Sequence, residues 1–458
     1  MLNEAFKEKM RKIPSLDCDA LFSALEEGEA VRGLRINIVK TDIAAFLAQC
    51  NLPLKKLPYA DDGFILESDE PLGNTPEHHA GQFYLQDPGA MATVNAVDIK
   101  RGFVCLDMCA APGGKSSQIA AKIGDEGLLI ANEFVPKRAK TAVGNFERLG
   151  LKNTIVTSLD TRELPRLFDG FFDLVLADVP CSGEGMFRKS EEALRDWSEE
   201  NVRASAERAL KILENAAPTV KARGFLLHST CTFSLEENEM TVSAFLERHP
   251  EFHLVEVTDA VKECTACGVR YNGCRTKNIE FCRRFYPHIS PGEGQFIALM
   301  QKDCGGEQAR GVRYKDASRP LPKELFDAVR RFFRENMACD LSDRVRLSGN
   351  NLVLIPHGVP LMPSSVFCCG VLLGEVRKGV LIPSHQFFSA YGKDFLRREH
   401  LNRGDGRIEK YLHGEEIDAI QAEGSGWCAV FYEGSALGGA KLSGGRLKNH
   451  YPKGLRRP

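Results

Sequence analysis

The chain holds 458 residues, enough for several domains at the usual ~100–200 residues each. Hydrophobic residues make up 43% of it and charged residues 27%, which excludes general disorder and a fibrous architecture. The formal net charge of −2 does not by itself indicate a nucleic-acid partner. No apolar stretch approaches the ~18–20 residues of a spanning helix, so we expect a cytoplasmic protein without a membrane partner, whose 15 cysteines are mostly free thiols.

Residues 1–90 mix short helical and extended patterns with proline and glycine, and predict a small N-terminal lobe. In residues 91–302, short apolar runs alternate regularly with helical patterns. Strands are expected at 104–109, 127–133, 154–160, 172–180, 224–233 and 295–302. Helices are expected at Lys115–Ile123, Pro136–Leu149, Asn201–Val220 and Leu235–Arg248. The alternation predicts an α/β fold, a mostly parallel sheet with helices on both faces.

After Asp303 the sequence becomes polar and predicts a linker. We expect a small mixed α/β domain within 303–385 and a glycine-rich, strand-rich domain within 386–458. From Lys441 to the end of the chain there are six basic residues and no acidic one. Such a run is more often a solvated face than a binding surface, although it can also contact phosphates.

The densest motif is the segment from Asp107 to Gln118, DMCAAPGGKSSQ, which follows the first regular strand and opens a helix. Glycines there allow the backbone to approach a ligand at the carboxyl edge of a sheet. Glu133 and Asp160 stand at the next two strand ends, where carboxylates can bind ribose hydroxyls and an adenine amino group. A lone acid of this kind is more often a helix cap, but acids at three successive strand ends weaken that interpretation. A nucleoside site without a phosphate loop favours S-adenosylmethionine over ATP or NAD.

Two cysteines follow two later strands, in Asp178-Val-Pro-Cys181 and Ser229-Thr-Cys231. Methylation at carbon 5 of a pyrimidine requires a nucleophile at carbon 6, and a thiolate is well suited to that role. A buried cysteine is more often a small core residue. Two thiols beside a cofactor site nevertheless favour chemistry.

These motifs, in this order, resemble the Nop/Sun family of RNA (cytosine-5) methyltransferases, and most of all its bacterial RsmF type. The resemblance rests on DMCAAPGGKSSQ, ANEFVPKRAK, SLD, ADVPCSGEGMFRK and STCTFSLEENE, and on the lead-in segments Arg35-Ile-Asn37 and HHAGQFYLQDPGAM. The ending, KYLHGEEI through LGGAKLSGGRLKNHYPKGLRR, is similar to a PUA-like RNA-binding domain. The resemblance therefore implies a Rossmann-like methyltransferase domain between an N-terminal lobe that contacts RNA and C-terminal RNA-binding domains.

The resemblance also implies the roles of the site residues. Cys231 would attack carbon 6 of cytosine, and Cys181 would help to resolve the covalent adduct. Asp178 would contact N3 of the flipped base, and Lys115 would favour a thiolate. Enzymes that methylate DNA use the Pro-Cys thiol as nucleophile, so Thr-Cys231-Thr favours the RNA class. The residues implied to bind or border S-adenosylmethionine are Cys109, Ala110, Ala111, Pro112, Gly113, Gly114, Lys115, Glu133, Asp160 and Asp178.

The implied partner is RNA, foremost 16S ribosomal RNA, either naked or within a 30S subunit. DNA is not expected as a partner, and a monomer is expected. A transfer-RNA methyltransferase and a non-catalytic ribosome-assembly factor remain alternatives, although the intact Cys181, Cys231 and Asp178 disfavour the second. An oxidoreductase with a dinucleotide site is disfavoured because the chain has no GxGxxG motif there.

Weaker signals lie in the second half of the chain. No metal site is expected, because Cys264, Cys267, Cys274 and Cys282 are irregularly spaced. Other side chains could contact RNA, although a structural histidine is as common as a contacting one, and aromatic rings in a small domain are more often core residues. Those candidates are Arg283, Arg284, His288, Phe387, Phe388 and Tyr391. Deletion of residues 441–458 is expected to weaken RNA binding more than S-adenosylmethionine binding.

Overall fold

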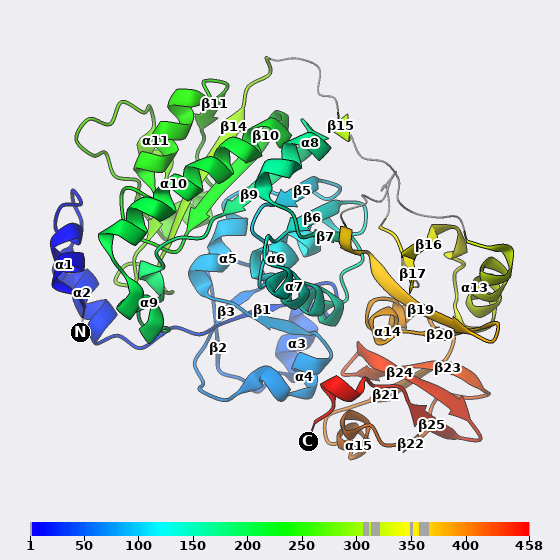
Figure 1. Ribbon diagram of the computed structural model, residues 1–458. Coiled ribbons are helices and arrows are strands. Elements are labelled where there is room, and N and C mark those ends of the chain that lie inside the picture. The colour runs from blue at the N-terminus through cyan, green and yellow to red at the C-terminus, as the bar shows by residue number, and fades with distance from the viewer. Residues whose placement is uncertain (1, 306–310, 313–320, 349–350, 357–365, 458) are drawn as a thin grey trace.

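A ten-stranded sheet forms the centre of the protein (Figure 1). The computed structural model describes residues 2–305, 311–312, 321–348, 351–356 and 366–457. Five parallel strands lie side by side in the order β10, β9, β5, β6 and β7. Their bounds are β5 Val104–Asp107, β6 Leu128–Asn132, β7 Thr154–Thr157, β9 Phe172–Asp178 and β10 Val220–Thr230. All five lie within or overlap the strands expected from the sequence.

Antiparallel strands extend this sheet on both sides, which makes the expected parallel sheet correct only for its centre. On one side β14 pairs with β10, and β11 and β13 pair with β14. On the other side β18 pairs with β7, so part of the segment 303–385 completes the central sheet. The antiparallel strands are β11 Phe252–Leu254, β12 Ala266–Cys267, β13 Arg283–Phe285, β14 Gln295–Lys302 and β18 Val366–Cys369.

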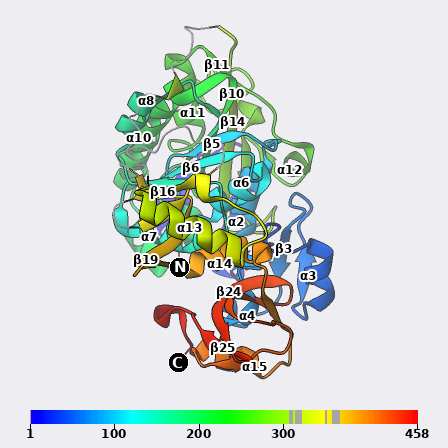
Figure 2. The ribbon, with the colours of Figure 1, turned by 90° about the vertical axis from the view of Figure 1, so that its right-hand side faces the viewer.

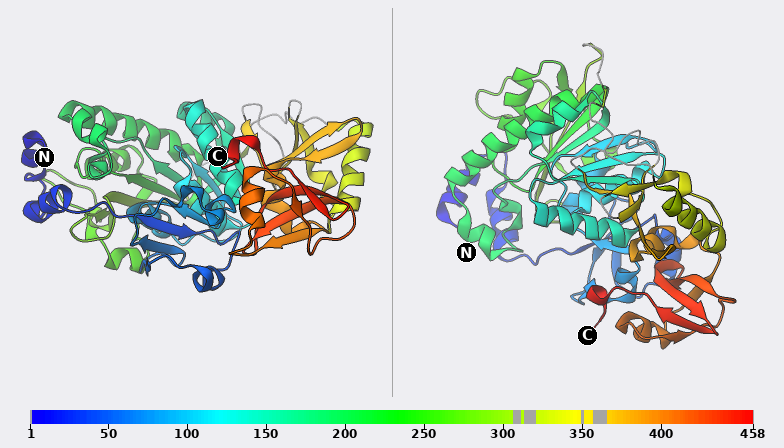
Figure 3. Two further views of the ribbon diagram at one scale, coloured as in Figure 1. Left: turned by 90° about the horizontal axis from the view of Figure 1, so that it is seen from below. Right: turned by 45° about the vertical axis from the view of Figure 1, so that its right-hand side comes forward.

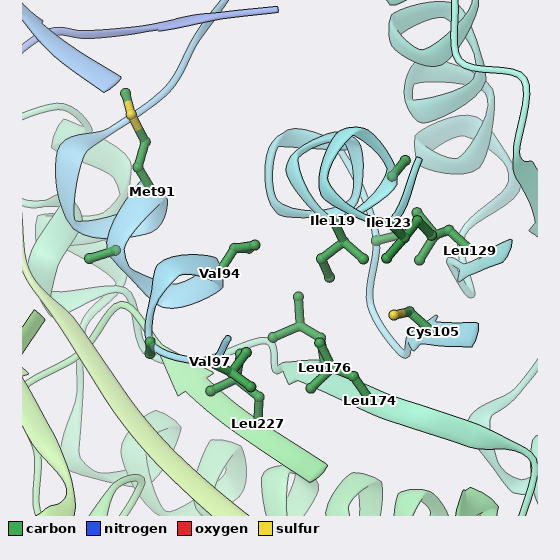
Figure 4. Packing of buried hydrophobic residues seen from close by; sticks show 14 of the residues in the cluster. Met91, Val94, Val97, Cys105, Ile119, Ile123, Leu129, Leu174, Leu176 and Leu227 are labelled. Carbon is green, nitrogen blue, oxygen red and sulfur yellow. The ribbon is translucent and has the colours of Figure 1, made fainter. Parts of the chain in front are cut away.

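Helices cover both faces of the sheet, as the sequence predicts. Alternate strand residues point to opposite faces, so Cys105 packs with one set of helices and Leu106 with the other. Figure 4 shows Ile119 and Ile123 over Leu174 and Leu176 in the first of these layers. One layer contains α5 Pro88–Asn95, α6 Gly114–Ile123, α7 Pro136–Leu149 and α12 Asp259–Glu263. The other contains α8 Leu164–Leu167, α10 Glu199–Ala216 and α11 Glu239–Arg248.

Two expected helices are shorter in the structure. Helix α10 ends at Ala216 rather than Val220, because Pro218 lies in a short 3₁₀ turn and Val220 already begins β10. Helix α11 begins at Glu239 rather than Leu235, because the four preceding residues form turns beside the sheet edge. Both helices are therefore shorter at the end that adjoins β10.

The N-terminal segment forms two separate parts. Four short strands build a small sheet in the order β2, β3, β1 and β4. The first two helices instead lie at the opposite end of the molecule from the C-terminal domains (Figures 1 and 3), where Phe6 stacks edge-on against Phe187 and Trp197. The elements are α1 Glu4–Met10, α2 Cys18–Glu26, β1 Gly33–Ile36, α3 Ile43–Gln49, β2 Leu54–Lys56, β3 Gly63–Leu66, α4 Pro76–His79 and β4 Phe83–Leu85.

The C-terminal region contains two further sheets, and in Figure 2 the second, drawn in orange and red, lies below the first. The first consists of β16 Val345–Ser348, β17 Asn351–Leu354, β19 Val371–Arg377 and β20 Val380–Pro383, covered by α13 Lys323–Asn336 and α14 His385–Tyr391. The second consists of β21 Arg398–Leu401, β22 Ile417–Asp418, β23 Gly426–Tyr432, β24 Ser435–Ser443 and β25 Arg446–Asn449, with α15 Arg407–His413. Phe387, Phe388 and Tyr391 are buried in the core between them, which confirms the structural reading of these aromatics.

The remaining short elements are β8 Phe168–Asp169, which pairs with β15 Gly311–Val312, and α9 Glu191–Asp196. Lys40 joins the units: its ammonium group donates to Ser389 Oγ at 2.9 Å and to the Ala436 carbonyl at 3.0 Å. The domain boundaries at 90, 302 and 385 stay predictions. Within the described ranges, no helix is both long and apolar enough to cross a membrane.

Candidate active site

The two motif cysteines meet at the carboxyl edge of the central sheet. Strands β9 and β10 are parallel neighbours that align Asp178 with Ser229, so the loops after them start side by side. The Sγ atoms of Cys181 and Cys231 lie 3.2 Å apart. The contact with the Cys231 thiol and burial together raise the pKa of Cys181 well above its ordinary value. Residues 50 positions apart in the chain thus form one pair of thiols.

Lys115 and Asp178 form an ion pair beside the thiols. The Lys115 ammonium group donates to Asp178 Oδ2 at 2.9 Å, and the Ser229 hydroxyl donates to Asp178 Oδ1 at 2.6 Å. Burial alone would lower the pKa of Lys115, but the charges of Asp178 and Cys231 and the hydrogen bond to Asp178 raise it. Lys115 therefore remains a cation within electrostatic reach of Cys231.

The segment from Cys109 to Gly113 forms a loop that leads into α6, and Lys115 lies in the first turn of that helix. Gly113, the residue before the helix, has φ +110°, a conformation that side chains other than glycine rarely adopt. Asp107 holds the start of the loop by accepting from the Cys109 amide at 3.1 Å and from the Ser116 hydroxyl at 2.6 Å. Arg138 and Asn145 of α7 donate to the carbonyls of Ala111 and Pro112, at 3.0 and 2.9 Å.

Acidic groups converge around the Cys109 side chain. Burial raises the pKa of this thiol well above its ordinary value, and the charges of Asp107, Asp178 and Glu133 add to the effect. The ends of β5, β6 and β9 therefore face one region. Burial, with a contribution from the Asp178 charge, also raises the pKa of Asp107 to about 7.

Glu133 and Asp160 lie beyond the ends of β6 and β7. Glu133 is 3% exposed, accepts from the Val135 amide at 3.0 Å and faces Arg138 at 3.6 Å. Asp160 accepts from the Arg162 backbone amide at 3.0 Å and pairs with its guanidinium at 2.7 Å, so it also caps a short 3₁₀ helix. These hydrogen bonds from Arg162 lower the pKa of Asp160.

Sequence reasoning missed three residues at this site. Phe134 follows Glu133 and is 64% exposed, an unusual position for a large aromatic ring. Glu184 and Glu237 are buried behind the thiol pair, each on one of the two cysteine loops. The motifs that contain these residues were visible in the sequence. The spacing of Glu184 and Glu237 in the sequence does not indicate that each acid contacts the loop that carries the other cysteine.

The arginines proposed to contact an RNA backbone are not available for it. Arg284 is 1% exposed and forms an ion pair with Glu239, with the Arg284 Nε to Glu239 Oε1 distance at 2.6 Å. Arg283 is 5% exposed and donates to Thr265 Oγ1 at 2.8 Å. That part of the prediction was wrong, because both arginines lie on β13, which pairs with a strand on each side, and their side chains have partners within the protein. His288 stacks on Tyr286 and is half-buried.

The cysteines between 264 and 282 occupy different environments. Cys282 is buried, Cys267 is exposed, and Cys264 and Cys274 are half-buried. In the part of the chain that the structure describes, no group of three or more His, Cys, Asp or Glu side chains is placed to hold a metal ion.

A Rossmann-like sheet with this loop after its first parallel strand, and with acids at the following strand ends, defines the class of S-adenosylmethionine-dependent methyltransferases. Three family models match the chain: 16S rRNA methyltransferase RsmB/F over residues 94–301, the N-terminal domain of 16S rRNA methyltransferase RsmF over 2–88, and the methyltransferase RsmF PUA domain over 398–457. The chain belongs to the RsmF family of methyltransferases.

Curated relatives match nearly the whole chain. Ribosomal RNA small subunit methyltransferase F of Aeromonas hydrophila is 31% identical, and the match covers 93% of this chain and 90% of the relative. The protein of the same name from Klebsiella pneumoniae is 31% identical over 99% of this chain and 96% of its own.

Solved structures share the fold over two thirds of the chain. A methyltransferase homologue from Pyrococcus horikoshii superposes with a TM-score of 0.57 at 24% identity, covering 66% of this chain and 95% of that one. NSun6 from Pyrococcus horikoshii, solved with SFG, has a TM-score of 0.56 at 21% identity, covering 66% and 99%.

Proposed function

We propose that this protein methylates carbon 5 of cytosine in RNA, with 16S ribosomal RNA as its substrate and S-adenosylmethionine as the methyl donor. The observation that carries the proposal is the pair of thiols 3.2 Å apart beside the Lys115–Asp178 ion pair. Carbon 5 of cytosine needs a nucleophile on carbon 6 before it can accept a methyl group, and this site supplies a thiol next to a cation. The names of the relatives support the choice of ribosomal RNA.

The proposed donor site fits a nucleoside with a charged side chain. Residues Cys109 to Gly114 are small or lack a bulky side chain, so backbone can border the methionine part of the donor. Glu133 has an oxygen available for ribose hydroxyls once Arg138 moves aside, and the exposed Phe134 ring offers a face for adenine. Asp160 would contact the adenine amino group only by sharing its oxygens with Arg162. S-adenosylmethionine bound there supplies the methyl group.

The side chains of the site divide the work on the base. Cys231 adds to carbon 6, and Lys115 favours the thiolate needed for this addition. Asp178 would contact the N3 side of the ring, where charge develops after the addition. After methyl transfer, a base takes the hydrogen on carbon 5 as a proton, and the electrons of that carbon–hydrogen bond restore the double bond between carbons 5 and 6. The bond between carbon 6 and sulfur breaks, and its electron pair leaves with Cys231 as a thiolate. Cys181 would assist this release.

The target cytosine must leave its stack to reach thiols at a sheet edge, so we propose an accessible or loosely paired base in ribosomal RNA. The substrate would be either naked RNA or a 30S subunit, the protein would act as a monomer, and DNA would not be methylated.

The test is methylation in vitro. The protein, labelled S-adenosylmethionine and small-subunit RNA from cells lacking this activity would be combined, with naked RNA, 30S subunits, transfer RNA and DNA as parallel substrates. The nucleosides would then be analysed by mass spectrometry. We expect 5-methylcytosine in 16S RNA or its subunit. Product only in transfer RNA would indicate a transfer-RNA methyltransferase. S-adenosylmethionine binding without product on any substrate would favour a ribosome-assembly factor.

The basic C-terminal segment offers a second prediction, but its deletion is not the right experiment. Leu442, Leu447 and Tyr451 are buried in the last domain, so deletion of residues 441–458 would also remove part of its core. Of the six basic residues, Arg446 is paired with Glu416 and Arg457 with Glu409, at 2.8 Å each.

Lys441, Lys448 and Lys453 are exposed, and Lys441 lies directly opposite Lys448 across strands β24 and β25. Like charges placed in this way repel each other unless an anion binds. Changing all three lysines to alanine should weaken RNA binding about tenfold and reduce the dependence of log Kd on log salt by about 2, with the S-adenosylmethionine affinity unchanged. Binding titrations at several salt concentrations measure both. An unchanged salt dependence would contradict an RNA contact by these lysines. Arg446→Ala, on the same strand as Lys448, is the control and should leave RNA binding and its salt dependence close to those of the wild type.

A further inference from the structure

Two buried acids lie behind the thiol pair, one on each cysteine loop. Glu184 follows Cys181 and is fully buried, and Glu237 follows Cys231 and is 1% exposed. Both accept hydrogen bonds from neutral N–H and O–H groups. A carboxylate is costly to remove from water, and the cost is offset only when donors satisfy its oxygens.

Glu184 reaches from its own loop to the loop that carries Cys231. Its Oε2 atom accepts from the Thr232 hydroxyl at 2.6 Å and from the amides of Phe233 and Ser234 at 2.8 Å each. The Trp197 indole donates to Oε1 at 2.9 Å and fixes the carboxylate from behind. Three consecutive residues after Cys231 are thus held by one acid from the Cys181 loop.

Glu237 makes the reciprocal connection. Its Oε2 atom accepts from the Ser182 amide at 2.8 Å, and its Oε1 atom accepts from the Ser182 hydroxyl at 2.5 Å. The hydroxyls of Ser182 and Thr232 are 2.9 Å apart, so the residues directly after the two cysteines also touch. The Gly185 amide donates to the Cys231 carbonyl at 2.9 Å, which adds a backbone link between the loops.

The arrangement is an expensive way to join two loops. Burial and the Glu184 charge raise the pKa of Glu237 to about 7. Keeping both carboxylates ionised near neutral pH therefore costs free energy. An apolar contact would join the loops with no such cost. Acids that bind specific amides and hydroxyls fix the spacing of the loops more closely than an apolar contact does, because hydrogen bonds are directional.

We propose that Glu184 and Glu237 are positioning residues that hold Cys181 beside Cys231, so that both thiols reach the same cytosine ring. The proposal rests on the proposed function, which assigns successive steps to the two thiols. With Glu184 and Glu237 in place, Cys181 stays near the ring while Cys231 is bonded to carbon 6. With either acid weakened, attack by Cys231 continues but release slows.

The first test measures the spacing of the thiols in the free enzyme, without RNA. Diamide oxidises two adjacent thiols to a disulfide, and its N=N bond takes up the two electrons and two protons that they lose. Peptide mass spectrometry would follow the linkage of Cys181 to Cys231 with time. We expect Glu237→Gln and Thr232→Val to slow this linkage about tenfold or more, because the loops separate. Glu236→Gln, which removes the ion pair with Lys9, is the control and should link at the wild-type rate.

The second test separates attack from release during turnover. In both variants we expect the covalent protein–RNA adduct to form and to persist about tenfold longer than in the wild type, with S-adenosylmethionine affinity within about twofold of normal. Thr232→Val retains both acids and the size of the side chain, so it tests the proposal even if Glu237→Gln does not fold. Wild-type linkage and wild-type release in Thr232→Val would overturn it.

A loss of S-adenosylmethionine binding that matches the loss of turnover would also overturn it, because it would indicate a general structural role. If the wild type forms no 5-methylcytosine on any RNA, the proposed function fails, while the diamide experiment still decides whether the acids set the thiol spacing.

Discussion

Replacing Cys231 with alanine is expected to abolish both the methylated product and the covalent protein–RNA adduct. Carbon 5 of cytosine is not nucleophilic until a group adds to carbon 6, and in the proposed function the Cys231 thiolate is that group. We expect the rate of 5-methylcytosine formation to fall at least about 10³-fold. Nucleoside mass spectrometry measures the product, and denaturing gels measure the adduct.

Two controls make this result specific. S-adenosylmethionine should bind Cys231→Ala with normal affinity, because the thiol lies on the loop after β10 and not on the loop that leads into α6. Cys267→Ala removes an exposed thiol in the same domain and should leave activity intact. Product at the wild-type rate from Cys231→Ala would rule out this cysteine as the nucleophile.

The sequence predicts those features of the protein that depend on short segments. Apolar runs and helical periodicity locate the parallel strands to within a few residues, because each strand and helix is a local pattern. The cofactor loop and both cysteine motifs follow directly from these strands. The proximity of Cys181 to Cys231 could also be expected, because parallel neighbours end at the same edge of a sheet.

Features that depend on distant partners could not be predicted in the same way. Arg284 looked like a surface cation, but its partner Glu239 lies 45 residues earlier, and the pair is buried between β13 and α11. The first two helices could not be placed, because their contacts are with Phe187 and Trp197, far along the chain. Glu184 and Glu237 belong to the same category. Their function depends on contacts between two loops that only the folded sheet brings together.

Replacing Cys181 with alanine is expected to have the opposite effect on the adduct, because the two thiols are proposed to act in succession. Cys231 would still attack carbon 6 and the methyl group would still be transferred, but loss of the carbon 5 proton and departure of Cys231 would slow. General acid–base assistance typically contributes ~10²–10⁴-fold, so turnover should fall at least about 10²-fold while adduct accumulates.

The experiment compares Cys181→Ala, Cys231→Ala and the double variant on the same RNA, scoring adduct on denaturing gels and methylated cytosine within that adduct. Adduct in Cys181→Ala that disappears in the double variant would assign attack to Cys231 and release to Cys181. Adduct that is lost in Cys181→Ala and retained in Cys231→Ala would reverse the two roles. The 3.2 Å separation of the sulfur atoms does not by itself decide the order. The Cys231 charge contributes to the raised pKa of Lys115, so these two side chains lie within electrostatic reach of each other. Cys231 thus stands near a cation, and together with the Thr-Cys231-Thr motif this leads us to expect that it is the nucleophile.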